Sequence, residues 1–179
     1  MMKKMICAIL ALTMLLSFTA CGGNKTDANT PAVTIEGTME ELATKVIEQN
    51  PVEFMGGFIP VDLADTSEEG LWAIKSFTGL DSAERISDLA VYEPMMGSLP
   101  FSMVMVRVAE GSDAKTVAEN MKANIDQRKW VCVEADDLLV AGYSDVVMLI
   151  MVGSDTGLTA QSFVDALKTV VGAEPNFVI

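Results

Sequence analysis

Few residues in this chain have side chains suited to catalysis. It contains no histidine, which removes Ser-His-Asp triads and imidazole proton transfer. Cys132 lies in an apolar run at residues 130–133 and has no imidazole to activate it, and burial raises the pKa of a thiol. We therefore expect Cys132 to be a small, inert core residue. We predict no catalytic residue and no disulfide.

Carboxylates gather in two predicted loops: Asp62, Asp65, Glu68 and Glu69 in the first, and Glu134, Asp136 and Asp137 in the second. Ca²⁺ prefers several oxygen ligands on one loop, but neither cluster has the spacing of a known calcium loop. We interpret both as solvated loops and predict no metal or cofactor, keeping the first cluster as a weak binding candidate. A two-carboxylate glycosidase site is disfavoured because the domain is small and few aromatic residues are present to stack on sugar rings.

Methionine is the other candidate ligand. Met95 and Met96 stand together in a predicted turn, and thioethers bind Cu(I). Without histidine or a regular methionine array, filling of gaps in the core is the favoured role for methionine. We keep Met95 and Met96 as weak binding candidates only.

The first 20 residues have the features of an export signal. Lys3 and Lys4 precede a 12-residue stretch, residues 5–16, that only Thr13 interrupts. This stretch is shorter than the roughly 20 residues that span a bilayer, and it suits the core of a signal peptide. An ordinary secretory signal with cleavage near Ala20 is one interpretation of this segment.

The small residues before Cys21 favour a second interpretation, because they resemble the lipobox of bacterial lipoproteins. That resemblance implies cleavage after Ala20 and a diacylglyceryl group on the Cys21 thiol. Phe18 departs from the pattern, which usually has an aliphatic residue there. Two acyl chains anchor a protein stably, whereas one does so only marginally.

The mature chain is strongly acidic. Without Lys3 and Lys4 it has 10 basic and 25 acidic residues, a net charge of −15. Nucleic acid and anionic headgroups repel such a surface, so we expect no nucleic acid partner and a covalent membrane anchor. Residues 21–37, small and polar in their first part, are predicted to be a flexible tether, and residues 38–179 a single domain.

Periodicity predicts an α+β domain. A capping box at residues 38–41 begins the first helix, which ends before Pro51, and Gly79 closes the second. The expected helices are 39–50, 67–77, 113–128 and 159–171, the strands 86–92, 101–108, 138–141 and 146–152, and short extended pieces 58–61 and 130–133. Because residues 146–152 include no polar member, that strand should be central. We predict an antiparallel sheet from two hairpins with helices packed on it, in two layers.

These features together resemble a family of uncharacterised lipoproteins common in Firmicutes, known only as a domain of unknown function. The resemblance includes Cys21 and its signal, residues 92–96, the strand at 104–108 and the late strand and helix. It implies a Gram-positive envelope lipoprotein and supplies no activity, ligand or catalytic residues.

The predicted function is that of a non-enzymatic binding or envelope-assembly module, lipid-anchored on the outer face of the cytoplasmic membrane, with a possible protein partner. Two alternatives remain open. One is a small-ligand-binding lipoprotein, which needs a pocket of roughly 300 Å³ or more. The other is a hydrolase that uses carboxylates alone, which needs two buried carboxylates facing each other across a cleft.

Overall fold

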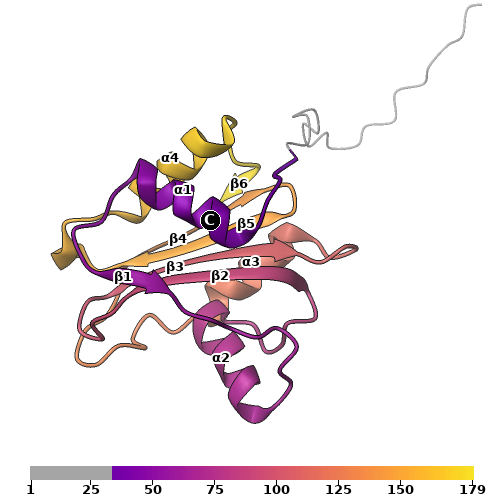
Figure 1. The fold of residues 1–179 in the computed structure, drawn as a ribbon, viewed down its shortest axis with the longest axis horizontal. Coiled ribbons are helices and arrows are strands. Elements are labelled where there is room, and N and C mark those ends of the chain that lie inside the picture. The colour runs from indigo at the N-terminus through magenta and orange to yellow at the C-terminus, as the bar shows by residue number, and fades with distance from the viewer. Residues whose placement is uncertain (1–33) are drawn as a thin grey trace, which may run out of the picture. The chain divides into compact units, whose positions relative to one another are not determined.

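The computed structural model describes residues 34–179 (Figure 1). The predicted signal, the cleavage site at Ala20, Cys21 and most of the expected tether lie outside the described residues. In chain order the elements are α1 (Met39–Gln49), β1 (Gly56–Phe58), α2 (Glu68–Thr78), β2 (Ile86–Pro94), β3 (Phe101–Val108), α3 (Ala114–Asn124), β4 (Asp137–Tyr143), β5 (Val146–Val152), the 3₁₀ helix η1 (Ser154–Thr156), α4 (Ala160–Val171) and β6 (Phe177–Val178).

The strands form one antiparallel sheet in the order β1-β2-β3-β5-β4-β6. The two predicted hairpins, β2–β3 and β4–β5, are confirmed. So is the central place of β5, whose seven residues are all buried between β3 and β4. The short edge strands differ from expectation: β1 begins and ends earlier than the extended piece predicted at 58–61, and β6 was not predicted.

Helices cover both faces of the sheet. In β3, Met103 and Met105 belong to the cluster formed with α1 and α4, whereas Val104 and Val106 belong to the cluster formed with α2 and α3. The α+β class with helices packed on an antiparallel sheet is therefore confirmed. The expected two layers must be corrected to three, because strands that are apolar on both sides require cover on both sides.

The connections explain why α3 and α4 lie on opposite faces. The chain passes from β3 through α3 to the parallel strand β4, and from β5 through α4 to the parallel strand β6, moving the same way along the sheet. Because β3 and β5 are antiparallel, two right-handed crossovers place their helices on opposite faces.

Local signals begin and end most helices. The capping box of α1 is present, with Thr38 accepting from Glu41 N–H and Glu41 accepting from Thr38 N–H. At the end of α2, Gly79 has a φ of 75°, and a Cβ there would lie 2.8 Å from Met121 O. That position therefore requires glycine. The predicted third helix proves shorter, because Ile125 turns to extended backbone and buries its side chain.

The segment after α3 contradicts one prediction. Residues 130–133 form no strand, and Cys132 is exposed with a φ of 63°. Val131 beside it is 73% exposed. The expected core role of Cys132 was therefore wrong: its apolar neighbours belong to a loop that runs over the surface.

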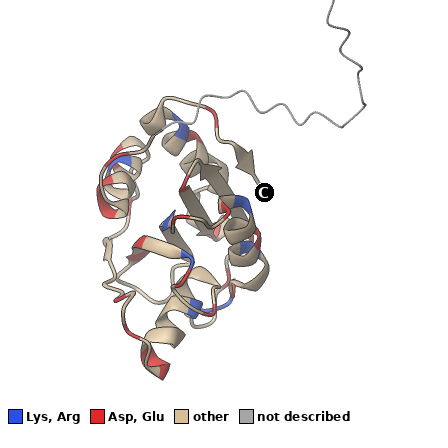
Figure 2. Cartoon of the chain, turned by 90° about the vertical axis from the view of Figure 1, so that its right-hand side faces the viewer, with Lys and Arg blue, Asp and Glu red and all other residues tan. Residues whose placement is uncertain are grey.

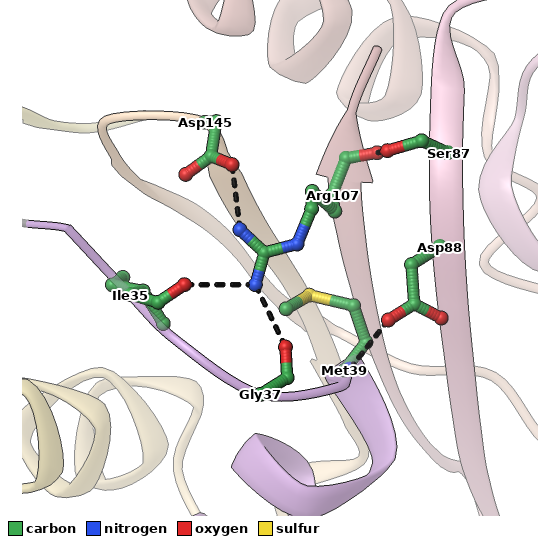
Figure 3. Close-up of polar contacts among 7 residues, drawn as sticks. All are labelled: Ile35, Gly37, Met39, Ser87, Asp88, Arg107 and Asp145. Carbon is green, nitrogen blue, oxygen red and sulfur yellow. Dashed lines mark hydrogen bonds and ion pairs between the residues drawn. The ribbon is translucent and has the colours of Figure 1, made fainter.

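The start of the domain is held by Arg107 at the end of β3 (Figure 3). Its guanidinium donates to Asp145 Oδ2 at 2.6 Å, to Ile35 O at 2.9 Å and to Gly37 O at 3.0 Å. Ile35 is buried in the core with α1. The packed structure thus begins upstream of the expected boundary at residue 38.

Candidate functional site

The predicted acidic cluster shapes a turn. Asp62 Oδ1 accepts from Ala64 N–H at 2.9 Å, and Asp65 Oδ1 accepts from Ser67 N–H at 2.9 Å. Hydrogen bonds from Ser67 lower the pKa of Asp65. Glu68 and Glu69 are exposed in the first turn of α2, where carboxylates favour the helix dipole. Within residues 34–179, no three His, Cys, Asp or Glu side chains come together as metal ligands.

Met95 and Met96 lie in the β2–β3 loop and are 72% and 59% exposed. The N–H of Met95 donates to Met55 O at 2.9 Å, and Met55 is itself 76% exposed. Core filling, the role favoured for methionine in general, is therefore wrong for these two, although it holds for Met103 and Met105 in β3. The exposed pair forms part of a surface.

A hollow of about 490 Å³ lies beside that surface. Its walls come from α2, from the end of β2, and from the last turn of α3 with the loop that follows. The residues that matter most to its chemistry are Trp72, Phe77, Glu93, Asn124, Lys129 and Trp130. We call it the Lys129 hollow.

An ion pair forms the floor of the Lys129 hollow. Lys129 Nζ lies 2.5 Å from Glu93 Oε1 and donates to Ser102 Oγ at 3.1 Å. The Lys129 and Glu93 side chains are 9% and 12% exposed, and Ser102 is fully buried. Burial lowers the pKa of Lys129, against the opposing charge of Glu93.

Aromatic rings flank the same ammonium group. Lys129 Nζ lies 4.9 Å from the centroid of Phe77 and 5.3 Å from that of Trp130, both within the range of cation–π attraction. Lys129 is therefore fixed by a carboxylate, a hydroxyl and two rings. Its charge faces an open hollow.

Exposed apolar side chains occur in the loops next to two of the lining residues, Glu93 and Trp130. We define the apolar rim as Met55, Trp72, Met95, Met96 and Val131, each at least 59% exposed. Val131 N–H donates to Gly97 O at 3.3 Å, which ties the loop after α3 to the β2–β3 loop. Exposed apolar side chains on neighbouring loops are typical of interaction sites, whereas single ones are ordinary.

The hollow brings together aromatic, charged and amide side chains. Asp126, Lys129 and Trp130 come from the loop between α3 and β4, whereas Trp72, Phe77, Glu93 and Asn124 stand on helices or a strand. Glu93 is engaged by Lys129, and the second carboxylate of the hollow, Asp126, is exposed. The two buried carboxylates required for the hydrolase alternative are not found in the hollow.

Comparison with known proteins returns no match: no family model, no curated protein and no solved structure is similar to this chain. The resemblance to the Firmicutes lipoprotein family therefore stays a prediction. Among the described residues, no helix combines the length and apolar character needed to cross a bilayer.

Proposed function

We propose that this chain is a lipid-anchored extracytoplasmic lipoprotein whose domain is a non-enzymatic binding module, and that the Lys129 hollow is its binding site. The observation that supports this most is the buried Lys129–Glu93 pair at the floor of an open hollow. A buried ion pair is seldom better for stability than apolar side chains of similar volume. Its retention in a concave, aromatic site favours recognition.

The described chain enters the domain away from the Lys129 hollow. Arg107 holds Ile35 and Gly37 beside Asp88, near the start of β2, whereas Glu93 stands near its end. At about 3.3 Å per residue, these positions on β2 are roughly 17 Å apart. The entry lies on the α1 face and the hollow on the α2 and α3 face. The first described residues therefore pack against the face of the sheet opposite the hollow.

A second candidate function is docking of a protein partner over the apolar rim. The exposure of Met55, Met95 and Val131 favours it, since apolar anchors at the centre of an interface supply most of its binding energy. The two candidate functions differ in the molecule that a crosslinker at the hollow would capture, which is a bound ligand for the first and a protein for the second.

The anchor is tested by fractionating cells that express Cys21→Ala. We expect this variant to leave the membrane fraction, because its remaining contacts with lipid are those of an acidic, repelled surface. Cys132→Ala removes the exposed thiol in the described domain and is the matched control, which should stay with the membranes. Sedimentation of Cys21→Ala with membranes would refute the anchor.

The binding site is tested by photo-crosslinking in native membranes. A photoreactive amino acid at position 75 lies on the hollow, and one at position 119 lies on the exposed side of α3. We expect adducts at 75 that are absent at 119. Equal labelling at the two positions would contradict the proposed site.

A further inference from the structure

We propose that the Lys129 hollow binds an uncharged carbohydrate, with a sugar ring against an indole face and its hydroxyls bonded to the side chains around it. This inference rests on the proposed binding function of the hollow. It follows from three features of the lining: its aromatic faces, its balance of charge and its hydrogen-bonding groups.

The aromatic faces come from the chain's two tryptophans. Trp72 stands on α2 and Trp130 in the loop after α3, and both line the hollow. Trp72 is 67% exposed, a large apolar area for one side chain to leave in water. The negative face of an aromatic ring attracts positively polarised hydrogens, and the C–H face of a sugar ring presents such hydrogens.

The charges in the lining cancel. Lys75 and Lys129 are matched by Glu93 and Asp126, on a mature chain whose net charge is −15. Acidic residues are spread over helices and loops elsewhere in the fold (Figure 2). Lys129 is paired with Glu93, and Lys75 lies 2.8 Å from Asp81. An anionic ligand would have to displace one of these carboxylates, whereas an uncharged ligand leaves both pairs intact.

Hydrogen-bonding groups stand at the edge of the hollow. Asn124 Nδ2 donates to Asn120 O at 2.9 Å, and Asp126 Oδ1 accepts from Arg128 N–H at 2.8 Å. These two hydrogen bonds orient the side chains. Neither of them uses Asn124 Oδ1 or Asp126 Oδ2. Amide and carboxylate oxygens accept from hydroxyl donors. The volume of about 490 Å³ lies within the range of small-molecule sites.

Intrinsic fluorescence tests the inference directly, because both tryptophans of the chain line this hollow. The mature chain, purified in detergent micelles, is titrated with maltotriose, cellotriose and triacetylchitotriose, each an uncharged trisaccharide. We expect at least one to give a saturable change in emission. Sorbitol, which has hydroxyls but no ring, should give none.

Variants separate stacking from nonspecific effects. Trp72→Ala should raise the Kd by roughly two- to tenfold, the range that corresponds to one aromatic contact, with Trp130 as the remaining reporter. Asn124→Ala should weaken binding as well. Glu119→Ala, an exposed change elsewhere on α3, should leave the Kd unchanged. Circular dichroism and urea midpoints establish that each variant is folded.

Several outcomes would overturn the inference. One is that none of the trisaccharides changes the emission of folded protein in a saturable way. A second is that Trp72→Ala binds with an unchanged Kd. A third is that zwitterionic glycine changes the emission while the sugars do not. If crosslinks at position 75 capture a protein while no sugar binds, the carbohydrate inference fails and the binding function stands. If position 75 also labels no more than position 119, both fail.

Discussion

Glu93→Ala would leave a cation in the interior without its counter-charge. The Lys129 side chain is 9% exposed, and its other hydrogen-bond partner, the Ser102 hydroxyl, carries no charge. Breaking a buried ion pair by removing one partner costs about 3–5 kcal/mol. The Lys129 hollow admits water from one side, so we take the lower end, about 3 kcal/mol. With a urea m-value of about 2 kcal/mol/M, the unfolding midpoint should fall by about 1.5 M.

The loss of stability in Glu93→Ala should also depend on pH. Burial lowers the pKa of Lys129 below its unfolded value, so the unfolded state binds more protons between the two values. Stability therefore rises as the pH increases through the folded pKa towards 10.5. Glu93 opposes this lowering, so in Glu93→Ala the rise should begin at a lower pH than in the parent chain.

Urea denaturation at pH 6, 7, 8 and 9, followed by circular dichroism, measures both effects. The double variant Glu93→Leu with Lys129→Met should recover most of the lost stability, because apolar replacement of a buried pair is close to neutral. Glu119→Ala on the exposed side of α3 is the control. A loss below about 0.5 kcal/mol in Glu93→Ala, with no shift of the pH profile, would refute the desolvated pair.

Three further perturbations test other parts of the fold. Arg107→Met removes the contacts to Ile35, Gly37 and Asp145; we expect a loss of about 2 kcal/mol and faster limited proteolysis near residue 35. Gly142→Ala places a Cβ 2.1 Å from Phe177 Cζ; β6 should be displaced at a cost of about 1–3 kcal/mol, seen as faster amide exchange at residues 177–179. In a protein of residues 21–179 that carries Cys21→Ala, Cys132 is the one remaining cysteine and should react stoichiometrically with a thiol reagent without denaturant, since it is exposed; a thiol that reacts only after unfolding would contradict its place in the loop.

The helices and hairpins were predictable because their signals are local. Thr38 and Glu41 form the capping box that the sequence indicates, and Gly79 takes the left-handed conformation that ends α2. The alternation of Met103 and Val104 in β3 fixes which side of the sheet each faces. Each of these features depends on residues only a few positions apart in the sequence.

The features that the sequence did not predict correctly depend on residues far apart in the chain. The apolar character of residues 146–152 already argued for cover on both faces, and so against the expected two layers. The edge strand β6 has two residues and pairs with Ala141 and Gly142, too few to show a period. Cys132 was misplaced because an apolar run predicts burial only when another element covers it.

The Lys129 hollow was missed for the same reason. Glu93 and Ser102 stand on neighbouring strands and meet Lys129 from a loop. One signal was available in the sequence: Ser102 lies between apolar residues in a strand whose other polar member is Arg107 near its end, at a position that faces the core. A buried polar side chain requires a partner, but nothing local indicates that the partner is Lys129.

The acidic surface and the neutral hollow have complementary physical consequences. The chain's net charge of −13 repels other copies, anionic headgroups and polyanions. The same field would attract cations to any exposed carboxylate. Inside the hollow, Lys129 and Glu93 lie 2.5 Å apart, so this pair adds no net charge to the site. Recognition then depends on shape, stacking and hydrogen bonds, the interactions that distinguish one uncharged ligand from another.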